Sequence, residues 1–307
     1  MNPSDLDLSV RLAAMDFLKR QTAIHAEALP RAILVAGFTF QEQRVALLGP
    51  PGIFKPTILP EIPLSITTVP ETAGRPRPYE DEIGPDGFLR YRYRGADPRH
   101  RDNVGLRQAR ESGVPLIYFY GLIPGRYAAV YPVYIVGDDP GGLTFTVAVD
   151  AAIQGSVDLV GLDNLTPEAR RAYATVTARR RLHQEMFRQQ VLLAYHEQCA
   201  VCRLRHGELL EAAHILPDRD PRGLPVVPNG LALCRLHHAA FDKYIMGIRP
   251  DYSIEVREDV LQEHDGPMLV HGLQGFHDRD IVVPRPDRLR PDREFLEERY
   301  LIFKKAG

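Results

Sequence analysis

The pattern of apolar and polar positions changes character near the middle of the chain. Residues 88–94 read FLRYRYR, which places arginines on one face of an extended segment and tyrosines on the other, as in a half-buried strand. Three apolar runs, VPLIYFYGLI, RYAAVYPVYIVG and GLTFTVAVD, predict further strands up to about residue 150. From about residue 165 the period becomes helical, with Thr166 as the expected cap and Pro167 at the first helical position.

These patterns predict an α+β protein with two main domains. No β-α-β alternation occurs in the first half, so we expect a mainly antiparallel, sheet-rich α+β or barrel domain over residues 1–150. A helical linker is expected over 151–190, a third segment over 191–250, and a C-terminal extension packed on it over 251–307. No apolar run reaches the roughly 20 residues that span a bilayer, and the N-terminus lacks signal-peptide features, so the expected location is cytoplasmic, away from membranes.

Charge adds a local signal rather than a global one. The formal net charge is −2, which excludes a uniformly basic surface. Residues 90–110 nevertheless hold seven arginines, and residues 168–205 hold eight. Such runs are often solvated surface, but the planar guanidinium also suits phosphates and base edges, which leaves nucleic acid as a candidate partner.

The cysteines point to a metal. The chain has three of them, an odd count without a secretory signal, so a disulfide framework is not expected. Cys199 and Cys202 are three residues apart, as are Cys234 and His237. Three sulfurs and one imidazole form a closed tetrahedral set that suits structural Zn²⁺. The alternative is three buried cysteines beside a surface histidine.

A second group of polar residues surrounds this cluster in the sequence. Residues 209–216, LLEAAHIL, predict a strand, and residues 231–242, LALCRLHHAAFD, predict a helix across it. Neighbouring helical residues point about 100° apart, so His238 must face away from the metal that His237 serves. His214, Asn229 and Asp242 could join it there. Taken singly, His214 could be a core residue and Asn229 a turn residue.

The order CxxC, AAHIxP, Asn, LCxxHHxxFD resembles the HNH endonucleases of the ββα-metal fold, in the zinc-braced form found in bacterial restriction enzymes. The resemblance covers residues 199–248. It implies that His214 is the general base, that Asn229 holds the catalytic loop, and that His238 binds a catalytic Mg²⁺ or Mn²⁺. Many members place an Asp or His ligand just before the base, whereas this chain has Ala213. The ion would then rely on His238 with waters and phosphate oxygens, or recruit Asp242 or Glu211.

The first half resembles SRA/PUA-like domains in its layout, with DNVGLRQARESGVPL and GRYAAVYPVYIV as the most similar parts. The resemblance implies a sheet that grips duplex DNA and a pocket for a flipped, modified base. Tyrosines that alternate on a strand are also common in protein cores. The candidate DNA-binding residues are Tyr79, Asp81, Arg92, Arg94, Arg99, His100, Arg101, Asn103, Tyr118 and Tyr120.

The resulting hypothesis is a modification-dependent restriction endonuclease that hydrolyses double-stranded DNA. One HNH site cuts one strand, so a double-strand break requires either a homodimer or two independent events. The alternatives are an HNH nuclease for unmodified DNA and a zinc-dependent DNA-binding protein without catalysis.

Overall fold

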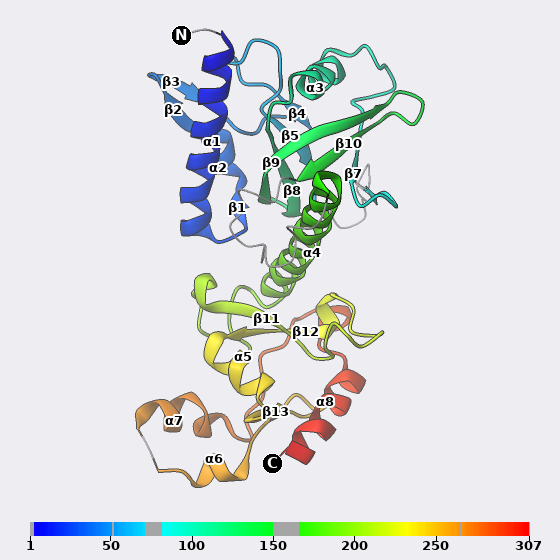
Figure 1. The fold of residues 1–307 in the computed structure, drawn as a ribbon. Helices are drawn as coiled ribbons and strands as arrows, with labels where there is room; N and C mark the ends of the chain where they lie inside the picture. Colours follow the sequence, from blue (N-terminus) through cyan, green and yellow to red (C-terminus); the bar gives the residue numbers. More distant parts are fainter. Residues whose placement is uncertain (1–2, 51, 71–81, 150–165, 265, 307) are drawn as a thin grey trace. The chain divides into compact units, whose positions relative to one another are not determined.

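The computed structural model describes residues 3–50, 52–70, 82–149, 166–264 and 266–306 (Figure 1). It divides the chain into two compact units, residues 1–185 and residues 186–307. The predicted helical linker corresponds in its described part to helix α4, Pro167–Ala194, which belongs to both units. Thr166 caps this helix as expected, since its Oγ1 accepts a hydrogen bond from Ala169 N at 3.2 Å.

The first unit combines a large sheet with helices. Besides α4, its described helices are α1 (Pro3–His25), α2 (Arg31–Ala36) and α3 (Arg101–Ser112). Its described strands are β1 (Leu29–Pro30), β2 (Phe38–Phe40), β3 (Gln43–Val45), β4 (Ile53–Phe54), β5 (Ser65–Thr68), β6 (Glu82–Ile83), β7 (Leu89–Arg92), β8 (Leu116–Ile123), β9 (Arg126–Asp139) and β10 (Thr144–Val149).

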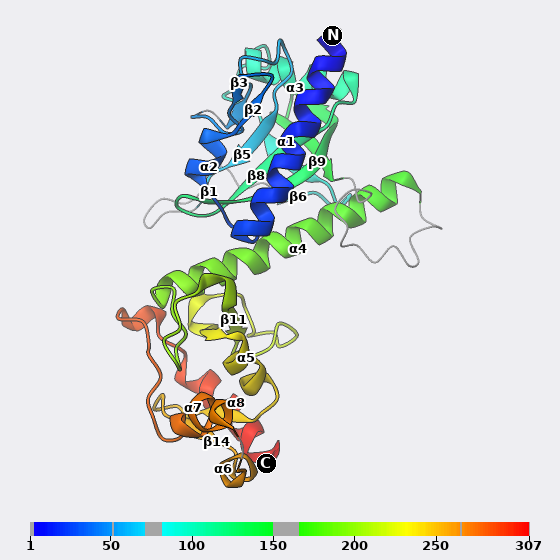
Figure 2. The same cartoon turned by 90° about the vertical axis from the view of Figure 1, so that its left-hand side faces the viewer.

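The sheet of this unit is mixed but mainly antiparallel. Its strand order is β4-β5-β8-β9-β10-β7-β6, with β1 added to β9, and only the β5–β8 pair among these ladders is parallel. The sheet curls, with α1 and α3 beside it (Figures 1 and 2). One core forms where Val10, Ala14 and Leu18 of α1 meet buried residues of β8 and β9. The α+β class is confirmed; the SRA/PUA-like identity stays a prediction.

Several local predictions for this unit are confirmed. Within the alternating segment 88–94, residues Leu89–Arg92 form β7. Tyr91 and Tyr93 are buried, and Arg92 and Arg94 are exposed. The segment VGLRQARESG predicts a short helix ended by Gly113, and Gly113 follows α3 in the left-handed conformation, at φ 60°. Two predictions about helix starts are wrong. The sequence predicts Ser4 or Asp5 as the N-cap of the first helix, but α1 already includes both residues. The segment VGLRQARESG predicts a helix from Val104, but α3 begins at Arg101.

The second unit is built on a β-hairpin and a short helix. Its strands are β11 (Leu210–His214), β12 (Gly230–Cys234), β13 (Met246–Ile248) and β14 (Ile254–Val256). Its helices are α5 (Arg235–Asp242), α6 (Glu258–Gln262), α7 (Pro267–Gly272) and α8 (Arg293–Ala306), with 3-10 turns η1 (Gly207–Leu209), η2 (Val227–Asn229), η3 (Gln274–Phe276) and η4 (Asp287–Leu289).

One hydrophobic core holds the second unit together. It joins the last turns of α4 to the hairpin, to α5, and to buried residues of the C-terminal extension such as Ile254 and Leu296. Gly230 lies against Phe187 and Val191 of α4, and a side chain at this position would collide with both. Residues 251–307 therefore share a core with the segment that carries the cysteines.

Two predictions for the second unit need correction. The helix expected over residues 231–242 begins only at Arg235, because residues 230–234 pair with β11 as strand β12. All five residues of β12 are buried, and periodicity cannot distinguish a fully buried strand from a helix. Residues 281–284 read IVVP, which predicts a short strand, but they form none; the neighbouring Asp280 makes an isolated bridge to Ser253.

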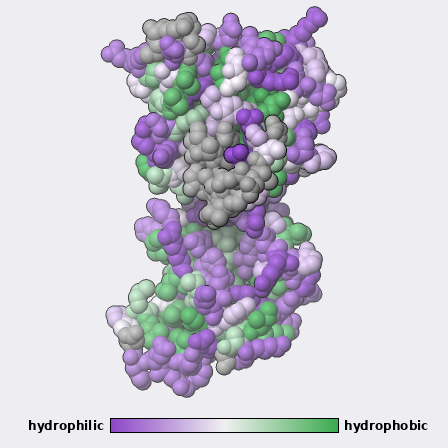
Figure 3. Space-filling view, viewed as in Figure 1, coloured by the Kyte–Doolittle hydropathy of each residue, from purple (hydrophilic) through white to green (hydrophobic). Residues whose placement is uncertain are grey.

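The surface is mostly hydrophilic on the face shown in Figure 3, with apolar patches between the polar regions. Within the described residues, none of the helices is both long and apolar enough for a membrane span.

Candidate functional site: a metal cluster beside a histidine-carboxylate cluster

The four predicted metal ligands converge in the second unit. One ligand atom from each of Cys199, Cys202, Cys234 and His237 lies within 4.8 Å of all the others. Cys199 and Cys202 sit on a tight turn closed by hydrogen bonds from Arg203 N to Cys199 O (3.0 Å) and from Cys199 N to Leu204 O (2.9 Å). Cys234 ends β12 and caps α5, whose first turn presents His237.

The spacing of these atoms fits a tetrahedral ion. Cys202 Sγ lies 3.9 Å from Cys234 Sγ, and His237 Nδ1 lies 3.1 Å from Cys234 Sγ and 3.5 Å from Cys199 Sγ. Tetrahedral Zn²⁺, with Zn–S bonds near 2.3 Å, separates its sulfur ligands by roughly 3.8 Å. A Cys₃His set of this kind can hold a metal such as zinc.

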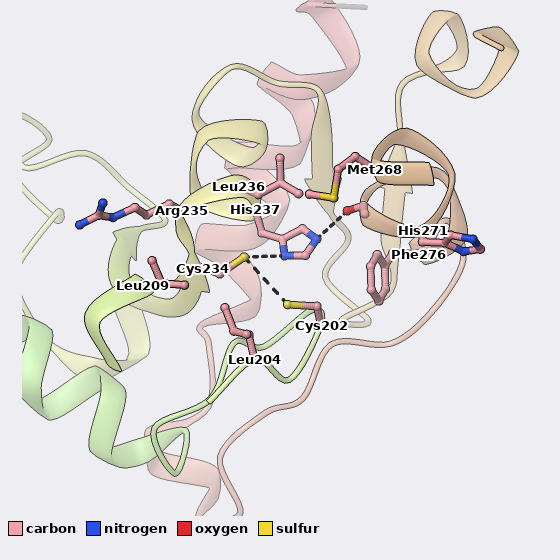
Figure 4. Close-up of a pocket in the computed structure, with 11 residues that line it drawn as sticks. Cys202, Leu204, Leu209, Cys234, Arg235, Leu236, His237, Met268, His271 and Phe276 are labelled. Carbon is pink, nitrogen blue, oxygen red and sulfur yellow. Dashed lines mark hydrogen bonds between the residues drawn. The ribbon is translucent and has the colours of Figure 1, made fainter. Parts of the chain in front are cut away.

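Neighbouring groups also orient His237 and shift the pKa values of the cysteine thiols. His237 Nε2 lies 2.9 Å from Gly272 O, which fixes Nδ1 as the nitrogen that faces the sulfurs (Figure 4). Hydrogen bonds to Cys202 and Cys234, with burial, raise the pKa of the Cys199 thiol, while hydrogen bonds from the other two thiols lower the pKa of Cys234. Thiols this close cannot all ionise without a neutralising cation, so a bound cation such as Zn²⁺ would complete the donor set.

His214 ends strand β11 in a defined environment. Phe187 of α4 stacks on its ring, with centroids 4.2 Å apart and planes 25° apart. Its Nε2 is shielded from solvent and has no hydrogen-bond partner among the described residues. Burial lowers the pKa of His214 below 6.5; Asp218 and Asp242 act in the raising direction and His238 in the lowering one. The imidazole is therefore neutral at pH 7 and able to accept a proton.

Asn229 is buried at the other end of the loop that joins β11 to β12, residues 215–229, which we call the base loop. Its Oδ1 accepts a hydrogen bond from Leu216 N at 2.9 Å. Its Nδ2 donates to Leu216 O and Leu224 O, each at 3.1 Å. Because Leu216 follows His214 by two residues, the Asn229 amide fixes the backbone that leaves the histidine.

His238 faces two carboxylates instead of sulfurs. Its Nδ1 lies 2.6 Å from Glu211 Oε2 on β11, and its Nε2 lies 3.3 Å from Asp242 Oδ2, one turn further along α5. Ala213, the position before His214, is fully buried and offers no ligand. Imidazole and carboxylate oxygens are ligands that divalent ions such as Mg²⁺ and Mn²⁺ accept, so these three residues are able to hold such an ion.

The candidate DNA-binding residues occupy contrasting positions in the first unit. Arg92, Arg94 and Arg99 are exposed, and Arg101 has 86% of its side chain accessible. Arg94 forms an ion pair with Asp102, and His100 caps α3 by accepting from Asp102 N at 3.2 Å.

The other candidates are less accessible. Tyr118 and Tyr120 are buried, and the hydroxyl of Tyr118 is 3.0 Å from Thr68 Oγ1. Asn103 is fully buried, and its amide binds the backbone of Arg94 and Asp97, so it organises the arginine loop from inside. Tyr79 and Asp81 lie outside the described residues.

Two residues near the site, Phe187 and Arg299, were not predicted from the sequence. Phe187 lies on a buried stripe with Val191 and Tyr195, and helical spacing alone does not indicate which residue stacks on His214. Arg299 of α8 lies 3.6 Å from Asp242 Oδ1 across 57 residues of chain, and nothing in the local sequence indicates that contact.

Strands β11 and β12, helix α5 and the Cys₃His cluster all lie in one short segment of the chain. Residues 199–249 match the family model described as HNH endonuclease. The chain therefore carries an HNH endonuclease domain at these residues, which supports a nuclease.

The other comparisons add little. A search of curated proteins finds no match to this sequence. Among solved structures, the chain is similar to a protein described as "Modification dependent TagI restriction endonuclease", with 17% identity, coverage of 79% of this chain and 82% of that chain, and a TM-score of 0.30. A TM-score this low does not establish a shared fold.

Proposed function

We propose that the protein is a metal-dependent DNA endonuclease in which His214 is the general base. This proposal is supported by the electrostatic influence of His238 on α5 on the pKa of His214 at the end of β11, inside the segment that matches the HNH endonuclease family. DNA is the substrate that an endonuclease of this family implies.

His214 would remove a proton from the water that attacks phosphorus, as the bond from phosphorus to the leaving sugar oxygen breaks. Its lowered pKa keeps the imidazole unprotonated at neutral pH, and the stacked Phe187 ring limits its rotation. Asn229 would act by holding the backbone of residue 216, which keeps the imidazole in position.

His238, with Glu211 or Asp242, would hold the catalytic Mg²⁺ or Mn²⁺, and the Cys₃His cluster would hold structural Zn²⁺. The divalent ion supplies charge that offsets the negative charge growing on the phosphate. Glu211 lies closer to the imidazole than Asp242 does, which supports Glu211 as the carboxylate that replaces the residue missing at Ala213.

A plasmid-nicking assay with Mg²⁺ or Mn²⁺ tests the nuclease proposal. We expect His214→Ala to lower the single-turnover rate by about 10²–10⁴-fold, the usual worth of general base catalysis, with zinc content unchanged. His264→Ala, a change at an exposed histidine of the same unit, is the matched control and should cleave like the wild type. Equal activity in all three proteins would reject His214 as the base.

We further propose that the first unit reads DNA and selects a modified base. The exposed guanidiniums of Arg92, Arg99 and Arg101 support phosphate contacts there. A binding panel of duplexes with unmodified, methylated, hydroxymethylated and phosphorothioated sites tests the preference. Equal affinity across the panel would favour the alternative of a nuclease for unmodified DNA. Salt-sensitive binding without cleavage of any duplex would favour a zinc-dependent binding protein. A homodimer stays a prediction.

A further inference from the structure

Helix α8 lies outside the HNH match, yet its contacts reach both halves of the candidate site. Leu296 and Phe303 are buried and fix the helix in the core of the second unit. Arg299 is three residues after Leu296 and four before Phe303, so its side chain lies on the same side of α8 as theirs. Glu298, its neighbour, points about 100° away. Two adjacent residues can therefore contact two different elements.

Arg299 holds the end of α5. Its side chain is 12% exposed, its Nη2 donates to Phe241 O at 3.1 Å, and its Nη1 donates to Tyr244 Oη at 3.1 Å. The guanidinium carbon lies 4.7 Å from the Phe241 ring centroid and 4.4 Å from that of Tyr244. A cation that binds a last-turn carbonyl stabilises a helix end, and α5 is the eight-residue helix that carries His238 and Asp242.

The same part of the chain also holds the base loop. Glu298 forms an ion pair with Arg222 at 2.7 Å, and Asp292 N, just before α8, donates to Pro228 O at 2.9 Å. Both partners belong to the loop that connects His214 to Asn229. The ion pair is half-exposed and contributes little stability by itself, so its effect is on the position of the loop.

We propose that α8 is a clamp that fixes the separation of the base loop from α5, with Arg299 as the positioning residue. The Arg299 guanidinium binds the Phe241 carbonyl and stacks on the rings of Phe241 and Tyr244. These contacts fix the position of His238 relative to His214, although Arg299 itself touches no reacting atom. The catalytic consequence rests on the proposed nuclease function, whereas the positional consequence does not.

The test compares Arg299→Met, Arg299→Lys and Arg293→Met in the full chain. Arg293→Met is the matched control, because Arg293 of the same helix stacks on Tyr252 at 4.8 Å and, among the described residues, contacts neither half of the site. Two quantities are measured: amide hydrogen exchange of residues 215–229 and 235–245, and single-turnover plasmid cleavage at varied DNA concentration. Zinc content is recorded for each protein.

We expect Arg299→Met to speed exchange in these two segments and to lower the cleavage rate at saturating DNA by on the order of 10–100-fold, because misplacement by about 1 Å costs that much. KM and zinc content should change little, Arg299→Lys should recover part of the rate, and Arg293→Met should match the wild type. Unchanged exchange, or exchange that rises throughout the unit with no recovery in Arg299→Lys, would overturn the clamp. If the wild type cleaves no DNA while Arg299→Met still loosens only these segments, the clamp stands and the nuclease proposal fails.

Discussion

His237 and His238 are neighbours on α5, but they occupy opposite chemical environments. His237 is 1% exposed, faces two sulfurs through Nδ1, and binds a backbone carbonyl through Nε2. The side chain of His238 is 23% exposed and lies between the carboxylates of Glu211 and Asp242. The first environment suits a soft-ligand structural ion, and the second suits a hard divalent ion open to solvent.

This difference teaches how a single helical turn can serve two purposes. Adjacent side chains diverge by about 100°, so one residue completes the Cys₃His cluster while the next faces the carboxylates of Glu211 and Asp242. The structural ion would then fix the position of the catalytic one. Variants that separate the two histidines are the strongest way to break or sharpen this comparison.

The largest expected effect is on stability, from His237→Ala. Removing one of four ligands should release zinc and lower the melting temperature of the second unit by on the order of 10–20 °C, since about 1 kcal/mol shifts a domain near 100 residues by roughly 4–8 °C. His238→Ala should keep its zinc and its melting temperature but lose about 100-fold or more in cleavage. Metal analysis, thermal melts and nicking assays on both proteins check this. Zinc loss in both, or in neither, would contradict the division of roles.

A mixed effect is expected from Asn229→Ala, which removes three hydrogen bonds to buried backbone groups. Each orphaned group costs about 1–3 kcal/mol, so chemical denaturation should show a loss of a few kcal/mol with zinc still bound. The single-turnover rate should also fall, because the base loop loses its brace. Asn229→Asp keeps the acceptor for Leu216 N and loses the two donated bonds. If these contacts position the base loop, its cleavage rate should lie between those of the wild type and Asn229→Ala. A wild-type rate in Asn229→Ala would argue against this positioning role.

A smaller effect is expected at the carboxylates. Glu211→Gln should raise the Mg²⁺ concentration needed for half-maximal cleavage by about 10–100-fold, while Asp242→Asn should raise it less. The reason is that Glu211 approaches the His238 imidazole more closely than Asp242 does. Isothermal titration with Mn²⁺ gives the same comparison without catalysis. The reverse ranking would identify Asp242 as the ligand.

The smallest expected effect is on the pH profile. Burial lowers the pKa of His214, so kcat/KM should be full above pH 6.5 and decline as pH falls through a midpoint below that value. Stability should decline over the same window, because the unfolded chain takes up the proton first. Asp218 acts to raise this pKa, so Asp218→Asn should move the midpoint lower still. A midpoint above 6.5 would mean that another group limits the rate.

The sequence predicts the second unit well where spacing determines geometry. The pairs Cys199–Cys202 and Cys234–His237 predict the cluster because three-residue spacing leaves few arrangements for two ligands. The order of His214, Asn229 and His238 places them on a strand, a loop and a helix. The start of α5 was misjudged because β12 is buried on all sides and shows no alternation.

The parts that escaped prediction depend on contacts between distant segments. Phe187 and Arg299 contact His214 and Asp242 from helices outside the motif. Which residue of a helix contacts a distant segment depends on the tertiary structure and cannot be read from local spacing. In the first unit, alternation of tyrosine and arginine predicted the strand and its exposed face. Whether Tyr118 and Asn103 face DNA was beyond such a pattern, and both are buried.

The most direct test of the separate roles of His237 and His238 is a crystal structure. Crystals are grown with Zn²⁺ and Mn²⁺, and anomalous diffraction is measured at the absorption edges of both metals. The account predicts a zinc peak within bonding distance of three sulfurs and His237 Nδ1, and a separate manganese peak at His238 beside Glu211. A single ion shared by both histidines, or a zinc peak at His238 with none among the cysteines, would contradict it.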